Sequence, residues 1–224
     1  MNPKLKWFTA VVIALYFVSV NFFYELPFGS SIFQDVPGNH WALYDIEEMY
    51  NRGLMKGRDE TVWNFYPEKE MTRAELIALM LKVNDVEVDK LPKPDKSKYT
   101  DVPVETHWAA AAIAEADKRG LIPFKDATGT EFKPDQPITR GELAEAVVEA
   151  MHMPISKDGK TFADAQGSPY EPAIRTVVDH NYAKGNEDGT FRPDEKAKRE
   201  QVASMFARSL REYRPLKEAK GEDK

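Results

Sequence analysis

The chain carries one sequence pattern three times, and this repetition limits the folds open to it more than any other feature. Each copy opens with an aromatic residue two positions before an aspartate, and a second aromatic follows eight or nine positions after the first. A Phe-x-Pro triplet comes later, and a basic segment begins seven residues after its Phe. The copies run over 33–83, 99–151 and 162–210. Spacings kept through three copies predict a tandem array that must be understood per repeat.

Each copy is predicted to form a helix, a loop and a second helix. Polar residues suited to N-capping precede the first helix: Asn39, Thr106 and Ser168. Residues suited to a left-handed helix end follow it: Gly53, Gly120 and Asn181. Apolar residues recur between these points at helical spacing.

The second helix should begin with a capping box in two copies, formed by Thr72 with Glu75 and by Thr139 with Glu142. Copy three has Lys198 at this position, so the hydroxyl acceptor is missing. An apolar stripe follows each start, and a single helical hairpin cannot bury it alone. The sequence therefore predicts an all-α fold of three helix-loop-helix repeats, packed as a pseudo-threefold, three-pronged bundle with the second helices inside.

The expected domain organisation follows from the repeats and the composition between them. Segment 85–98 contains two prolines and many charged residues, as is typical of a solvated linker. The expected parts are an N-terminal segment 1–31, repeat one 32–84, the linker 85–98, repeat two 99–153, a short linker 154–161, repeat three 162–213 and a charged tail 214–224. The chain is expected to be a monomer with an internal pseudo-trimer.

The N-terminal segment has the pattern of an export signal. Lys4 and Lys6 precede an apolar run over residues 7–24, within which no residue is charged. The run is long for a signal peptide and slightly short for a spanning helix, so a cleaved signal and a retained membrane anchor both stay open. In both cases the repeats are delivered outside the membrane, and a retained segment would contact it.

Charge and cysteine content narrow the partners. The net charge of −6 argues against nucleic acid as a partner, because nucleic-acid binding needs a concentrated basic face. The absence of cysteine excludes disulfides and thiolate metal sites, and we expect neither a metal nor a cofactor.

The motifs resemble those of the S-layer homology (SLH) domain family. Copy one has Phe-Gln-Asp-Val-Pro at 33–37, His-Trp-Ala at 40–42 and Thr-Arg-Ala-Glu at 72–75. Copy two has Asp-Val-Pro at 101–103, His-Trp-Ala at 107–109 and Thr-Arg-Gly-Glu at 139–142, and copy three has Gly-Thr-Phe-Arg-Pro-Asp at 189–194. The resemblance covers about residues 32–211. It implies non-covalent binding of secondary cell-wall polysaccharides, often through a pyruvate ketal, and hence localisation at the bacterial cell wall or surface.

The resemblance assigns ligand contact to one arginine per copy: Arg73, Arg140 and Arg199. A planar guanidinium can bind both oxygens of a carboxylate. Each arginine falls in the first turn of a second helix, where exposed backbone N–H groups and the helix dipole are expected to attract an anion. The alternative role is ion pairing with a nearby acid such as Glu75 or Glu142.

Three further groups complete the candidate site. The second aromatics of each copy could form a wall against a sugar face, or could pack one repeat on the next: Trp41, Trp108 and Tyr170. The aspartates of the opening triplets are expected to act first in turns, with hydroxyl recognition as a second role: Asp35, Asp101 and Asp164. Two Lys-Gly pairs would bring backbone and ammonium close to the ligand: Lys56 with Gly57, and Lys184 with Gly185. Copy two has Pro123 and Phe124 in place of such a pair, which puts its site in doubt.

The sequence thus predicts a non-enzymatic protein that binds a cell-wall polymer. Three alternatives stay open: an SLH-derived protein-interaction module, a wall-glycan hydrolase, and a calcium-dependent module. The carboxylates of the repeats are explained by caps and turns, which disfavours the hydrolase. The calcium reading is weak because the Asp-x-Asp-x-Asp-Gly spacing is absent.

Overall fold

A computed structural model describes residues 31–57 and 63–213, and over these ranges the chain is helical without a named β-strand. The predicted export segment and the charged tail lie outside the described residues. None of the helices in the described part of the chain is long and apolar enough to cross a bilayer.

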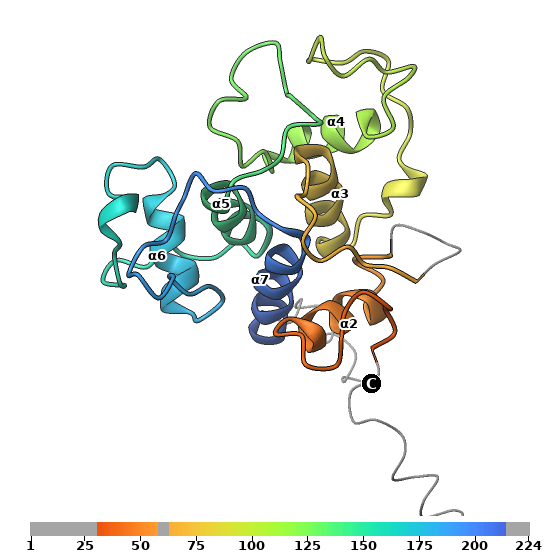
Figure 1. The fold of residues 1–224 in the computed structure, drawn as a ribbon. Coiled ribbons are helices and arrows are strands. Elements are labelled where there is room, and N and C mark those ends of the chain that lie inside the picture. Colours follow the sequence, from red (N-terminus) through yellow and green to blue (C-terminus); the bar gives the residue numbers. More distant parts are fainter. Residues whose placement is uncertain (1–30, 58–62, 214–224) are drawn as a thin grey trace, which may run out of the picture.

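Each repeat contributes one outer and one inner α-helix, as predicted (Figure 1). The outer helices are α2 (Leu43–Asn51), α4 (Ala110–Arg119) and α6 (Glu171–Asp179). The inner helices are α3 (Arg73–Val83), α5 (Arg140–Ala150) and α7 (Arg199–Glu212). Two short 3-10 helices complete the fold, η1 (Val88–Lys90) in the linker and η2 (Ala163–Ala165) at the start of repeat three.

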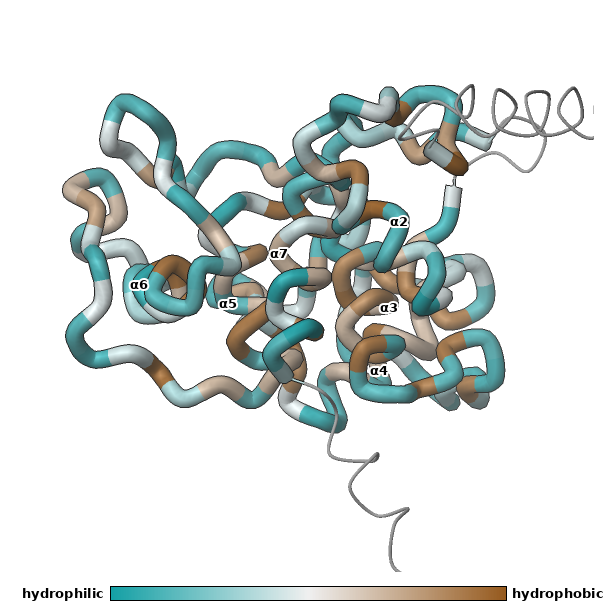
Figure 2. The backbone as a smooth tube through the Cα atoms, turned by 90° about the horizontal axis from the view of Figure 1, so that it is seen from below, coloured by the Kyte–Doolittle hydropathy of each residue, from teal (hydrophilic) through white to brown (hydrophobic). Residues whose placement is uncertain are grey.

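The inner helices form the core. Their apolar stripes are buried, as the predicted periodicity requires: Leu76, Ile77, Met80 and Leu81; Leu143, Ala146, Val147 and Ala150; Val202, Met205, Phe206 and Leu210. In Figure 2 the hydrophobic residues accordingly gather around α3 and α5, while hydrophilic residues lie toward the outside.

The three prongs do not coincide with the three sequence repeats. Helix α4 of repeat two packs on α3 of repeat one, and α6 of repeat three packs on α5 of repeat two. Helix α2 of repeat one packs on α7 of repeat three, which closes the ring. Every prong therefore combines the outer helix of one repeat with the inner helix of the repeat before it, so no repeat can complete its own hydrophobic core.

A cyclic set of backbone hydrogen bonds joins the repeats just before their inner helices. Ile138 N–H donates to the Met71 carbonyl at 2.9 Å, and Ala197 N–H donates to the Ile138 carbonyl at 2.9 Å. Met71 N–H donates to the Ala197 carbonyl at 3.2 Å and completes the triangle. This ring of three bonds gives the molecule its pseudo-threefold centre.

The outer helices begin three or four residues later than predicted. The expected N-caps were wrong for Asn39 and Thr106, because the chain first turns after Pro37 and Pro103. The N-caps are Ala42 and Ala109, which have no capping side chain. A histidine holds the turn before each of them: His40 Nδ1 accepts from Ala42 N–H at 3.2 Å. His107 Nδ1 accepts from Ala109 N–H in the same way. In copy three the Ser168 hydroxyl accepts from Tyr170 N–H at 3.3 Å in the turn before the helix, but the N-cap of α6 is Tyr170, so the expected Ser168 cap was wrong as well.

The predicted left-handed residues and capping boxes are confirmed. Gly53, Gly120 and Asn181 have φ of 70°, 70° and 60°. Both Thr-x-x-Glu boxes form at α3 and α5. At α7 only half of the box exists: Gln201 Oε1 accepts from Lys198 N–H at 3.0 Å, and the ammonium of Lys198 cannot accept in return.

Candidate binding site at the junctions between repeats

The aspartate of each opening triplet fixes the Phe-x-Pro turn of its own repeat. Asp164 accepts from Phe191 N–H at 3.0 Å and from Arg192 N–H at 2.6 Å. Asp35 and Asp101 make the matching pairs of bonds in the other two copies. The middle residue of each Phe-x-Pro triplet has a left-handed backbone although it is not glycine, with φ of 57° to 59°: Tyr66, Lys133 and Arg192. The predicted turn role of the aspartates is therefore observed, and hydroxyl recognition stays a prediction.

The turn then caps the inner helix of the preceding repeat. At the start of α5, Arg140 N–H donates to the Glu195 carbonyl at 2.9 Å and Gly141 N–H donates to the Pro193 carbonyl at 2.8 Å. The starts of α3 and α7 have equivalent bonds, to the Pro134 and Pro67 carbonyls among others. The expectation of exposed N–H groups at these helix starts was wrong, because the orphan donors of the first turn are satisfied by the neighbouring repeat.

We call the three contacts between an inner-helix arginine and the following repeat the Arg73, Arg140 and Arg199 junctions. In the Arg140 junction, Nε donates to the Phe191 carbonyl at 2.9 Å and Nη2 to the Lys184 carbonyl at 3.5 Å. The guanidinium lies 4.6 Å from the centroid of the Phe191 ring, a favourable cation–π distance. Burial lowers the pKa of Arg140 below its ordinary value, which reflects the cost of removing this charge from water.

The Arg199 junction repeats this geometry across the ring closure. Arg199 Nε donates to the Phe65 carbonyl and Nη2 donates to the Lys56 carbonyl, both at 3.0 Å. The guanidinium lies 4.6 Å from the Phe65 ring centroid. Repeats three and one are thus joined as repeats two and three are.

The Arg73 junction is different, because carboxylates hold the guanidinium. Nη2 of Arg73 donates to Asp126 Oδ1 at 2.6 Å and to Glu142 Oε1 at 2.7 Å. Nη1 donates to the Phe132 carbonyl at 3.1 Å. The ion-pairing role considered for Glu142 is observed here, with an arginine of the neighbouring repeat.

All three arginines are nearly enclosed. Their exposed fractions are 2% for Arg73, 7% for Arg140 and 6% for Arg199. They lie between repeats, where they join one repeat to the next. Only a narrow edge of the Arg140 and Arg199 side chains reaches solvent, so a ligand would have to meet that edge together with exposed neighbours.

The Lys-Gly pairs contribute exposed cations and close packing. Lys56 and Lys184 are exposed, and their carbonyls receive the arginines. A Cβ on Gly185 would lie 2.2 Å from Phe162 Cε1, so this position has no room for a side chain. A Cβ on Gly57 would lie 3.0 Å from the Asn64 carbonyl oxygen. The glycines let the loop close on its own repeat.

The three second aromatics divide into two roles. Trp41 and Trp108 are 56% and 62% exposed, so neither is a core residue, although the Trp41 side chain hydrogen-bonds to Glu200 of repeat three. Each stacks on the histidine before it, with ring centroids 6.1 Å apart. Tyr170 is half-buried, and its hydroxyl accepts from Lys125 N–H at 3.4 Å, so it does pack between repeats. Burial raises the pKa of Tyr170 to about 12.

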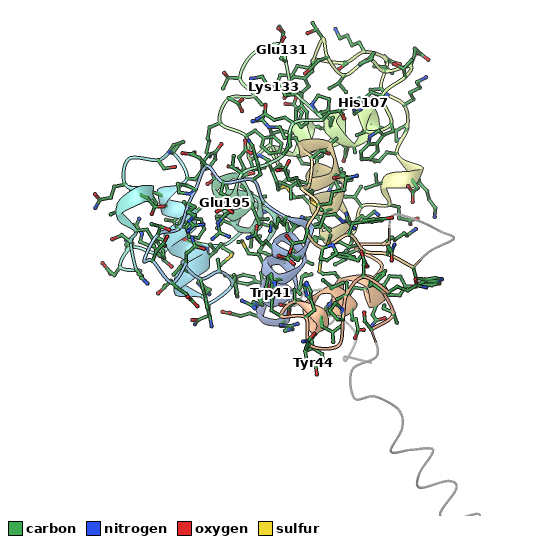
Figure 3. All side chains as sticks on the ribbon, in the orientation of Figure 1. Trp41, Tyr44, His107, Glu131, Lys133 and Glu195 are labelled. Carbon is green, nitrogen blue, oxygen red and sulfur yellow. The ribbon has the colours of Figure 1, made fainter. Side chains whose placement is uncertain are left out.

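Trp41 stands beside the start of α7, next to the Arg199 junction (Figure 3). There His40 Nε2 lies 3.1 Å from Glu200 Oε2. Burial raises the pKa of the Glu200 carboxyl, and the nearby Glu68 adds to this. The exposed indole and the histidine thus lie at the first turn of α7, where the Lys56 carbonyl of repeat one also accepts from Arg199.

Sequence reasoning missed several residues of these junctions. Asp126 and Phe124 were not predicted to contact Arg73, although the loss of Lys-Gly in copy two signalled a change there. The proline carbonyls could not be recognised as helix caps, because capping by another repeat depends on the ring closure.

A bundle of three such repeats, closed into a ring through Phe-x-Pro turns and inner-helix arginines, defines a repetitive helical binding module. The S-layer homology domain profile matches residues 32–77, 98–144 and 161–203. The chain belongs to this family.

Similar proteins come from bacterial surfaces. The chain is 32% identical over 187 residues to Cell surface glycoprotein 1 of Acetivibrio thermocellus, covering 79% of this chain and 8% of that protein. It is 32% identical over 152 residues to the Cellulosome-anchoring protein of the same organism, covering 65% of this chain and 33% of the relative. It is 33% identical over 127 residues to S-layer protein sap of Bacillus anthracis, covering 57% of this chain and 14% of that protein. The chain therefore spans a third or less of the length of these relatives.

Proposed function

We propose that this protein attaches to the bacterial cell wall by binding an anionic wall polysaccharide at the Arg140 and Arg199 junctions. The surface and anchoring proteins similar to it support attachment at the cell surface. A pyruvylated secondary polymer is the proposed ligand, since it offers a carboxylate, hydroxyls and an apolar ring face.

The observation that carries the proposal is the charge of Arg140. Among the described residues, the only hydrogen-bond acceptors of its guanidinium are the neutral carbonyls of Phe191 and Lys184. Glu195 and Asp164 act on this charge only from beyond hydrogen-bond distance. A buried cation that no carboxylate hydrogen-bonds is costly, and an anionic ligand would supply that direct partner. Lys184 is exposed at the same junction and provides the first contact for that ligand.

The Arg199 junction adds an apolar surface. The exposed Trp41 presents a flat ring beside the start of α7, suited to stacking against a sugar. Two junctions on one polymer strand would raise retention through effective concentration, even if each binds modestly.

Binding without turnover is part of the proposal. An endoglucanase of Bacillus sp. (strain KSM-635) and an uncharacterized cell wall amidase of Bacillus anthracis are also similar, and the chain covers only 18% and 32% of them. We assign the described repeats to attachment. A polymer that keeps its chain length after incubation with the protein would support this.

The test is co-sedimentation of the full chain, in mild detergent, with purified wall sacculi. We expect Arg140→Gln to weaken binding about 10- to 100-fold, because a charge-assisted hydrogen bond contributes about 1.5–3 kcal/mol. Arg119→Gln is the matched control, since Arg119 is exposed on α4 and, within the described ranges, pairs only with Glu115. Mild acid removal of ketals should abolish binding by the wild type. Equal retention on treated and untreated sacculi would reject pyruvate as the recognised group.

A further inference from the structure

The Arg73 junction has the same backbone framework as the other two, yet its guanidinium is turned. In the Arg140 and Arg199 junctions, Nε donates to the carbonyl of the Phe-x-Pro phenylalanine. In the Arg73 junction, Nη1 makes that bond, and Nε is buried without a hydrogen-bond partner. Something in repeat two draws the guanidinium away from the shared position.

Two carboxylates explain the rotation. Asp126 and Glu142 both accept from Nη2 of Arg73, at 2.6 Å and 2.7 Å. Asp126 also pairs with Lys133, at 3.3 Å. Burial alone would raise the pKa of Asp126, but its interactions with Arg73 and Lys133 together outweigh this and lower the pKa, so the carboxylate is charged at neutral pH.

The face of the guanidinium is covered as well. Arg73 lies 4.5 Å from the ring centroid of Phe124, which stands where the other repeats have the glycine of their Lys-Gly pair. Phe124 in turn packs edge-on against Phe132, with centroids 5.5 Å apart. The aromatic ring and the two acids together leave Arg73 only 2% exposed.

Copy three shows what the same position looks like without this neutralisation. The third residue of α7, equivalent to Glu142, is the neutral Gln201, which still accepts from the N-cap N–H. The loop of repeat three presents the Lys184 carbonyl to the arginine where repeat two presents the Asp126 carboxylate.

We infer that Asp126 is a built-in ligand of Arg73: with Glu142 it fills the place of the polymer's carboxylate, so the Arg73 junction, unlike the Arg140 junction, is closed to the wall polymer. This inference rests on the proposed polymer binding. In Figure 3, Lys133 of this closed junction lies well apart from Glu195 at the start of α5 and from Trp41.

The test counts binding sites by titration calorimetry, with purified polymer chains of one length released from the wall. Asp126→Asn combined with Glu142→Gln should raise the number of sites per full chain by one, because Gln can keep the cap as Gln201 does. Arg140→Gln should lower it by one. Arg73→Gln should not change it, and it is combined with Glu142→Gln so that no buried carboxylate is left without its arginine.

The outcomes separate the inference from the function beneath it. If the wild type binds no polymer, the proposed function itself is rejected. If the wild type binds and the Asp126→Asn, Glu142→Gln protein gains no site, the inference is overturned. Loss of a site on replacing Arg73 would overturn it independently, so a misfolded first variant, recognised by circular dichroism, still leaves a decisive measurement.

Discussion

At the scale of single residues, the Phe-x-Pro triplet of repeat three makes several structural contacts at once. The N–H of Phe191 is held by Asp164, its carbonyl receives Arg140, and its ring lies under the guanidinium. Two residues on, the Pro193 carbonyl caps α5. These contacts explain the fixed spacing of the Phe-x-Pro triplet seven residues before the inner helix. The bond to Asp164 holds the turn within repeat three, while the carbonyls of Phe191 and Pro193 reach α5 of repeat two.

Asp164→Ala should destabilise the protein by about 1–3 kcal/mol, because two backbone N–H groups in the turn lose their acceptor. Burial would raise the pKa of Asp164, but the bonds from Phe191 and Arg192 lower it below its ordinary 3.8. A lowered folded pKa means the contribution is complete above about pH 4 and is lost as pH falls further. Urea unfolding of wild type and variant should therefore converge in acid.

Asp194→Ala is the control for this measurement, since Asp194 is an exposed acid in the same turn region and accepts none of these bonds. A stability loss as large in Asp194→Ala, or a gap between wild type and Asp164→Ala that does not narrow at low pH, would contradict the turn role.

At the scale of elements, the signals that worked were those contained in one helix. The capping boxes of α3 and α5 and the left-handed residues Gly53 and Gly120 depend on side chains a few positions apart, and all were predictable. The starts of the outer helices were not, because a turn precedes α2 and α4 in which the rings of His40 and His107 accept a backbone N–H, a role that their sequence neighbours do not reveal. The arginines were located correctly on their helices, but their burial depends on the neighbouring repeat.

Lys198→Thr should stabilise the protein by about 0.5–1 kcal/mol, because a hydroxyl at this N-cap would complete the capping box with Gln201. The change also removes the exposed ion pair of Lys198 with Glu68, which contributes little. Thermal unfolding of Lys198→Thr should be compared with Glu68→Gln, which removes the ion pair alone. The interpretation fails if Lys198→Thr is less stable than Glu68→Gln.

At the scale of the whole molecule, the sequence predicted three repeats and an inner set of helices but not the exchange of partners. Every copy contains one outer and one inner helix, so pairing within a repeat and pairing with the previous repeat satisfy the same local pattern. The choice is made by non-local contacts: α2 packs on α7 although most of the chain separates them. The Arg73 junction also depends on this exchange of partners, since Glu142 of repeat two contacts Arg73 of repeat one because the two repeats pack on each other.

Because of this exchange, removal of repeat three should unfold the remainder. A chain ending at residue 160 lacks α6 and α7, so α5 and α2 both lose the helix on which they pack. The first N–H groups of α5 also lose their acceptors at Glu195 and Pro193. Far-UV circular dichroism should then show far less than two thirds of the native helical signal, without a cooperative thermal transition. A protease site placed in the linker 85–98 is the matched control: cutting there breaks the chain but removes no helix, so the two pieces should stay associated and folded. Two folded modules in the shortened chain, with native helicity and a sharp transition, would show that the repeats are independent units and that the ring closure adds nothing to their stability.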